Sequence, residues 1–202
     1  MMGYFAQQSL PRMSITEFDG KPSLWIEFIT QIRDLVHNQP FLNDIQRSSL
    51  VVQHLKGEAK LAVQGNTMDW RGYVLSLKRL KFLFGQRSEI ARHVLQTVTS
   101  GKPVGDNDFD ALAQYYYTVC NCLTTLKQLD FASDLYSSDT LRQAVKRLPQ
   151  RMVNKWAEYS LSLRQRSQDP NLLHFEVWLQ ARVLASKDAC VVDVRERKQK
   201  KS

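Results

Sequence analysis

The stretch FDGKPSLWIEF, residues 18–28, decides the fold of this chain. Asp19-Gly20 is a turn dipeptide, and Pro22 suits the first position of a helix. Trp25 and Phe28 are one helical turn apart, so both aromatic side chains lie on the same helix face. The stretch therefore predicts a helix that is docked by aromatic residues behind a tight turn, which is structural rather than catalytic chemistry.

The rest of the first half continues in helices. Apolar residues recur with a 3.6-residue period, Asn43 is a good N-cap, and Gly85 is placed to end a helix in the left-handed conformation. Residues 13–18 are expected to be extended. The predicted helices span residues 22–38, 43–57, 58–64, 69–84 and 88–99.

A sharp helix–helix corner is expected at Leu55-Lys56-Gly57-Glu58-Ala59. Glycine ends one helix there, and Glu58 opens the next, where the helix dipole favours a negative charge. Many helical proteins contain such corners, so this motif alone is weakly specific.

The segment 101–106, Gly-Lys-Pro-Val-Gly-Asp, is rich in helix and strand breakers and predicts a domain boundary. After it, apolar periodicity indicates one long amphipathic helix, which Asp106 or Asp108 could cap, and three shorter ones. The predicted organisation is an N-terminal lobe at 1–100, a linker at 101–106, a C-terminal lobe at 107–188 and a basic flexible tail at 189–202. The later helices are expected at 107–130, 138–147, 149–164 and 171–187.

Composition and charge favour an intracellular globular protein. The chain is 43% hydrophobic, has no apolar run near the roughly 20 residues that span a bilayer, and does not begin with a signal-peptide pattern. Its three cysteines are odd in number and lack zinc-ligand spacing, so reduced thiols in the cytosol are expected.

The net charge of +8 lies entirely in the last third of the chain. Residues 1–140 hold 14 basic and 14 acidic residues, whereas residues 141–202 hold 14 and 6. Such a gradient favours contact with a polyanion, although solvated helix faces would carry similar charges. These basic residues include Arg142, Lys146, Arg147, Arg151, Lys155, Arg164 and Arg166, and, in the tail, Arg195, Arg197, Lys198, Lys200 and Lys201.

The sequence offers no catalytic, metal or cofactor motif. There is no D-[ST]-G loop, phosphate-binding glycine loop, H-E-x-x-H or G-x-S-x-G segment. The four histidines fall in separate predicted helices, with no acid or thiol at recurring metal spacing. An enzyme is therefore not expected.

Aromatic residues are expected mainly in the core, including Trp156 and Trp178, rather than stacked on bases. Tyr115-Tyr116-Tyr117 differs, because three consecutive helical residues cannot all face one core. At least one tyrosine should be exposed. It could contact another subunit or simply lie along the surface.

Taken together, these residues resemble the Gag capsid region of BEL/Pao-type retrotransposons and, more loosely, Ty3-type and domesticated Gag capsids. The resemblance rests on the order and spacing of residues along nearly the whole chain rather than on any single motif. They are Phe18, Gly20, Trp25, Phe28, Leu55, Gly57, Glu58, Ala59, Phe84, Gly85, Leu148-Pro149, Trp156 and Trp178.

The resemblance implies an all-α protein of two lobes that assembles through hexamers and pentamers into a shell around RNA, as intracellular virus-like particles. The first lobe would form rings through helices 22–38 and 69–84, and the second would make two-fold contacts through helix 107–130 or 138–147. The usual zinc knuckle is absent from this chain, so RNA contact is expected from the basic C-terminal end. Two alternatives remain: a non-assembling monomeric or dimeric adaptor that binds a host protein or nucleic acid, and a sequence-specific DNA-binding protein.

Overall fold

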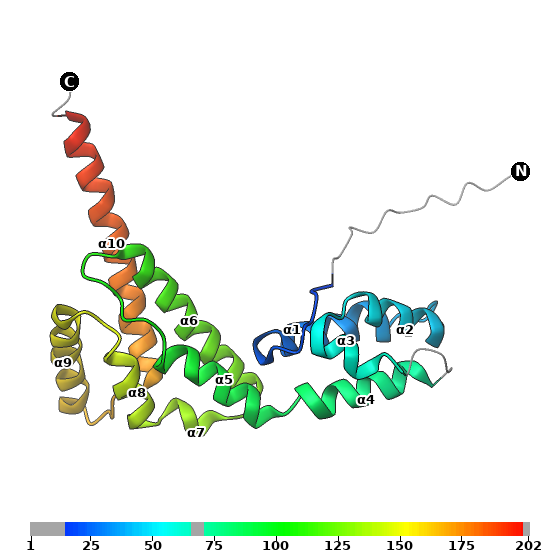
Figure 1. Cartoon of the computed structure of the whole chain (residues 1–202). Helices are drawn as coiled ribbons and strands as arrows, with labels where there is room; N and C mark the ends of the chain where they lie inside the picture. The colour runs from blue at the N-terminus through cyan, green and yellow to red at the C-terminus, as the bar shows by residue number, and fades with distance from the viewer. Residues whose placement is uncertain (1–14, 66–70, 200–202) are drawn as a thin grey trace, which may run out of the picture. The chain divides into compact units, whose positions relative to one another are not determined.

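The fold is all-α, as predicted (Figure 1). A computed structural model describes residues 15–65 and 71–199, with side chains described as far as Ser186. Within these residues the one β pairing is an isolated parallel bridge between Phe18 and Leu55. Contacts divide the chain into two compact units, Met1–Ile90 and Ala91–Ser202.

The first unit starts with α1 (Pro22–Ile32), in which Pro22 takes the first helical position. The single helix predicted over 22–38 is in fact α1 followed by a π-helix, η1 (Arg33–His37). Asn43 caps the next helix as predicted, in a capping box with Gln46. The remaining helices are α2 (Asp44–Gln53), α3 (Gly57–Val63), α4 (Gly72–Phe84) and α5 (Arg87–Thr99), and the division between the units falls within α5.

Two glycines behave differently from the prediction. The predicted helix 43–57 ends at Gln53, because Leu55 pairs with Phe18 instead, and Gly57 begins α3 rather than ending α2. Gly57 has a positive φ of 50°, which favours glycine. Gly85 ends α4 with φ −94°, so it is not left-handed. Because Gly85 has no side chain, the Trp25 ring can pack against its backbone.

The second unit contains the long α6 (Phe109–Gln128), capped by Asp108, whose side chain accepts a hydrogen bond from the Ala111 N–H. A four-residue helix, α7, was not predicted. α10 runs to Gln199, well past the predicted end at Lys187, because no Gly or Pro interrupts a sequence rich in helix-forming residues. The remaining helices are α7 (Ala132–Leu135), α8 (Ser138–Val145), α9 (Gln150–Gln165) and α10 (Leu172–Gln199).

The predicted linker at 101–106 lies wholly within the second unit. The Val104 side chain is buried, and its N–H donates to the Arg147 carbonyl at 2.7 Å. The Arg147 guanidinium in turn donates to the carbonyls of Thr97, Val98 and Lys102. Arg147 therefore fastens the end of α5 and the breaker segment to the end of α8.

Candidate assembly and nucleic-acid surfaces

The scattered motif residues of the first unit meet in one aromatic cluster around Phe18. The Phe18 ring stacks on Phe28 with centroids 4.9 Å apart and makes edge contacts with Trp25 and Phe84 at 5.5 Å. Its backbone pairs with residues 54–56, because its N–H donates to the His54 carbonyl and its carbonyl accepts from the Lys56 N–H, both at 2.8 Å. Phe18, Trp25 and Phe28 are buried, as are Leu55 and Ala59. The motif residues thus hold the unit together.

Two glycines allow this cluster to close. A Cβ on Gly20, where φ is 107°, would lie 3.0 Å from the Phe84 ring. A Cβ on Gly85 would lie 2.8 Å from the Trp25 ring and 2.7 Å from the Lys81 carbonyl. Each glycine therefore lets an aromatic ring from a distant part of the chain approach the backbone.

A second aromatic cluster fills the core of the second unit. Trp156 makes edge contacts with Phe175 at 5.2 Å and with Trp178 at 5.5 Å, and all three are buried. Tyr115 joins the same core through Phe175. Because the Trp156 ring is 6% exposed, it offers no platform for stacking a base.

The three consecutive tyrosines have three different environments. Tyr115 is 2% exposed, its hydroxyl donates to the Ala144 carbonyl at 2.8 Å with the Val98 carbonyl 3.3 Å away, and the Arg147 guanidinium lies over its ring. Tyr115 thus belongs to the core, and the prediction that it forms an assembly surface is wrong. Tyr116 is half-buried beside Cys120 and Glu176, and the hydrogen bond with Cys120 raises its pKa to about 12. Tyr117 is exposed, so at least one tyrosine is at the surface, as predicted.

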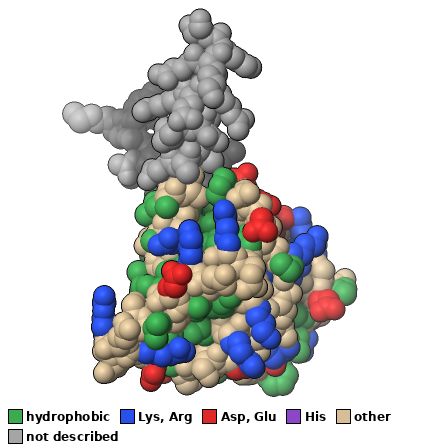
Figure 2. Space-filling model, turned by 90° about the vertical axis from the view of Figure 1, so that its left-hand side faces the viewer, with side chains coloured by type: hydrophobic (Ala, Val, Ile, Leu, Met, Phe, Trp, Pro, Cys, Tyr) green, Lys and Arg blue, Asp and Glu red, His purple; other side chains and the backbone are tan. Residues whose placement is uncertain are grey.

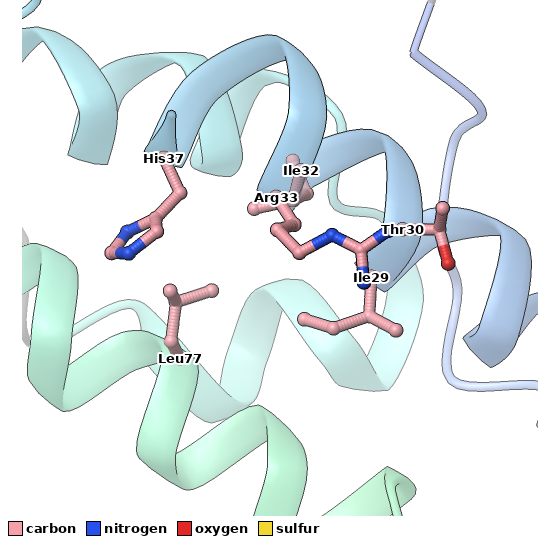
Figure 3. A pocket seen from close by; sticks show the side chains of 6 residues that line it. All are labelled: Ile29, Thr30, Ile32, Arg33, His37 and Leu77. Carbon is pink, nitrogen blue, oxygen red and sulfur yellow. The ribbon is translucent and has the colours of Figure 1, made fainter. Parts of the chain in front are cut away.

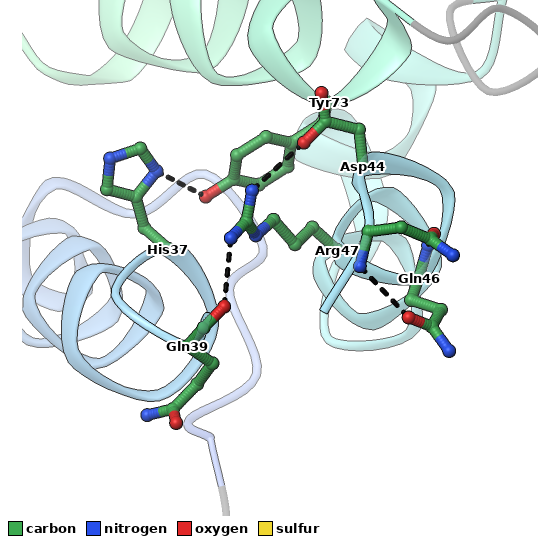
Figure 4. A network of polar contacts seen from close by, with 7 residues as sticks. His37, Gln39, Asp44, Gln46, Arg47 and Tyr73 are labelled. Atoms are coloured by element: carbon green, nitrogen blue, oxygen red, sulfur yellow. Dashed lines mark hydrogen bonds and ion pairs between the residues drawn. The ribbon is translucent and has the colours of Figure 1, made fainter. Parts of the chain in front are cut away.

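The π-helix presents a polar network at the start of α4 (Figure 4). Nδ1 of His37 and the hydroxyl of Tyr73 are hydrogen-bonded at 3.2 Å, and their rings stack. Arg47 donates to the Gln39 carbonyl at 2.9 Å and to the Asp44 carboxylate at 3.0 Å. Burial raises the pKa of Tyr73. This network ties η1, α2 and α4 together, which sequence periodicity cannot reveal.

A small pocket of about 270 Å³ opens beside this network, between α1–η1 and α4 (Figure 3). Its lining is mainly apolar, and Figure 3 shows the His37 ring near Leu77 and the Arg33 guanidinium at the opposite end, near Thr30 and Ile29. Arg33 is engaged by the Asp34 carboxylate at 2.8 Å. The pocket is lined by Ile29, Thr30, Ile32, Arg33, His37 and Leu77.

The outer face of α4 carries exposed apolar side chains. Val74 lies at one edge of this face, Phe82 and Leu75 lie two turns apart along its middle, and Leu83 lies at the other edge. Their exposed fractions are 46%, 72%, 44% and 49% respectively. In the described part of the first unit, nothing covers them. This face is a candidate interaction surface.

The basic residues of the second unit lie mainly at its surface, and on the face shown in Figure 2 Lys and Arg side chains predominate over acids. Arg147 is the exception, because its guanidinium is used inside the fold. In the tail, Arg195, Arg197 and Lys198 fall on α10 where side chains are not described, and Lys200 and Lys201 lie outside the described residues.

No group of three or more His, Cys, Asp or Glu side chains within the described residues could hold a metal ion. None of the helices in 15–65 and 71–199 combines the length and apolar composition needed to cross a bilayer.

A comparison with protein-family models identifies the family of this chain. The model of a family described as a protein of unknown function, DUF1759, matches residues 18–165. The chain belongs to the DUF1759 family. DUF1759 is typically found in retrotransposon Gag and polyprotein regions, and the match runs from Phe18 of the first aromatic cluster to the end of α9. No curated protein and no solved structure matches the chain significantly.

Proposed function

We propose that this chain is a structural capsid (Gag) protein of a BEL/Pao-type retrotransposon or of a domesticated derivative. It self-associates into a shell that packages RNA and has no enzymatic activity of its own. Membership of DUF1759 supports the retrotransposon origin. The observation that carries self-association is the exposed apolar face of α4.

The α4 face has the chemistry of a protein contact. Four large apolar side chains face outward, with Lys78 and Arg79 between them. Burying such side chains is favourable by about 25 cal/mol for each Å² of apolar surface removed from water. A single contact of this size is weak, but repeated contacts gain strength cooperatively when a ring or shell closes.

This self-association is tested by light scattering on the wild-type chain and on Phe82→Glu. The wild type should show a mass that rises with concentration beyond the dimer, and the variant should remain small because a carboxylate cannot be buried in an apolar contact. Leu161→Glu, which changes an exposed leucine on α9, is the matched control and should behave as wild type. Equal assembly of both variants would exclude the α4 face.

RNA packaging is assigned to the basic tail. Each phosphate contact made by Arg195, Arg197, Lys198, Lys200 or Lys201 should reduce the logarithm of the affinity for single-stranded RNA by about 0.7 per tenfold increase in salt. Deleting residues 195–202 should therefore weaken RNA binding and flatten its salt dependence. Unchanged RNA retention after the deletion would contradict the tail assignment.

The second candidate function is a non-assembling adaptor that keeps this fold and binds another protein. A groove between α8 and α9 in the second unit favours the adaptor function. A chain that stays monomeric or dimeric at all concentrations would support the adaptor rather than the capsid.

A further inference from the structure

The second unit contains a groove between α8 and α9 that shares no residue with the α4 face. It is about 580 Å³ in volume, within the range of sites that hold ligands. Its lining comes from both helices and from the segments at their ends. Its lining includes Leu141, Val145, Lys146, Val153, Trp156 and Arg164.

The floor of the groove is aliphatic. Leu141 and Leu148 are buried there, and Val145 and Val153 are half-buried, so their side chains remain partly accessible from the groove. Replacing the water that contacts this floor with an apolar side chain is favourable. The floor therefore selects a ligand with a bulky apolar group.

The rim of the groove is cationic. Arg142, Lys146 and Arg164 line it, and no acidic residue does. Arg142 is paired with the Asp139 carboxylate, which lies outside the lining. Lys146 and Arg164 take part in no ion pair among the described residues, although the Asp139 carboxylate also interacts with the charge of Lys146. The rim therefore keeps the charge of Arg164, and part of that of Lys146, available for carboxylates of a ligand.

Nucleic acid fits this groove poorly. Single strands bind by stacking bases on aromatic rings as well as by phosphate contacts. Trp156, the one aromatic residue of the lining, is covered by Phe175 and Trp178. A peptide uses both features, because its apolar side chain occupies the floor while its acidic side chains reach Lys146 and Arg164.

We propose that the α8/α9 groove binds a short acidic segment of a partner protein, anchored by one bulky apolar side chain. The proposal does not rest on self-association through α4, because the residues that form the groove all come from the second unit. It gives the adaptor function a definite partner chemistry.

The proposal is tested by selecting random twelve-residue peptides, displayed on phage, against the full chain. Enriched peptides should combine a Leu, Ile, Phe or Trp with flanking Asp or Glu. Their affinity, measured by fluorescence anisotropy, should fall about tenfold in Arg164→Glu, since a rim charge is reversed. Lys155→Glu, the same charge change on α9 outside the groove lining, should leave the affinity unchanged.

NMR on the wild-type chain keeps the test independent of variant folding. An enriched peptide should shift the methyl signals of Val145 and Val153 and the indole N–H signal of Trp156. Enrichment of peptides without acids, equal losses in both variants, or shifts confined to other residues would overturn the proposal. Shifts of the same methyl signals by oligouridylate, or loss of self-association rather than peptide binding in Arg164→Glu, would assign the groove to RNA or to a second copy and would also overturn it.

Discussion

The two units share a construction principle but differ in their surfaces. Each has a core of edge-packed aromatic rings, around Phe18 in the first unit and around Trp156 in the second. The first unit leaves apolar side chains of α4 exposed. The second unit includes residues 141–202, which carry the excess of basic residues, and it contains a groove with a cationic rim. Similar cores thus support an exposed apolar helix face in one unit and a groove with a cationic rim in the other.

Disrupting the aromatic core of the first unit should cause the largest loss of stability. Trp25→Ala removes a ring that is 4% exposed and should lower the free energy of unfolding of the first unit by about 3–5 kcal/mol. Phe82→Ala, which truncates a ring that is 72% exposed, should cost less than about 0.5 kcal/mol. Hydrogen exchange of amides in α1 to α4 measures both losses. A negligible loss for Trp25→Ala would show that the Phe18 cluster does not hold this unit together.

A smaller effect tests the close approach of backbone and ring in the same cluster. Gly85→Ala places a Cβ 2.8 Å from the Trp25 ring, so the ring or the end of α4 must shift, at a cost of about 1–3 kcal/mol. Gly65→Ala is the control, because its Cβ would meet nothing within 4 Å. Urea denaturation of both variants gives the comparison. If they are equally stable, Gly85 is only a helix terminator.

In the second unit, Tyr115→Phe tests the difference between the buried Tyr115 and the exposed Tyr117. It removes the hydroxyl that donates to the Ala144 carbonyl at 2.8 Å and should cost about 1–2 kcal/mol. Tyr117→Phe, on the exposed neighbour, should cost almost nothing. Chemical denaturation followed by circular dichroism distinguishes them, and equal stability of the two variants would show that the hydrogen bond of the Tyr115 hydroxyl does not stabilise this unit.

The smallest effect is a pH dependence specific to the second unit. Burial raises the pKa of the Cys122 thiol to about 12 from an ordinary value of 9.0. The folded state favours the neutral thiol, so the unfolded state gains more from ionisation at high pH. The contribution of Cys122 to the free energy of unfolding is therefore complete below pH 9 and is lost as the pH rises from 9 toward 12. Between pH 8 and pH 10 the wild type should lose about 1 kcal/mol more than Cys122→Ala. If the free energies of unfolding of the wild type and Cys122→Ala, measured by urea denaturation, change with pH in the same way, the thiol is not desolvated.

Local sequence signals predicted most of the helices. Pro22, Asn43 and Asp108 mark helix starts by their own backbone or side-chain chemistry, and the structure has a helix starting at or just after each of them. The π-helix was not predicted, because apolar spacing in 22–38 fits one continuous α-helix. α7 was also missed, since four residues are too few to show a period.

The candidate surfaces were harder to predict, because they depend on contacts distant in sequence. The bridge from Phe18 to Leu55 and the contact of Gly85 with Trp25 each join positions far apart along the chain. Arg147 looks like another surface charge in the sequence, but it fastens α5 to α8. Among Tyr115, Tyr116 and Tyr117, the sequence required one exposed ring but could not say which. The groove between α8 and α9 required the packed structure.

The central claim, self-assembly through an apolar face of the first unit, is tested most directly by negative-stain electron microscopy. The purified chain and Phe82→Glu are imaged at rising protein and salt concentration, with and without RNA. Closed, regular shells are expected for the wild type and only small particles for the variant. Persistently small wild-type particles under every condition, confirmed as monomer or dimer by light scattering, would contradict it.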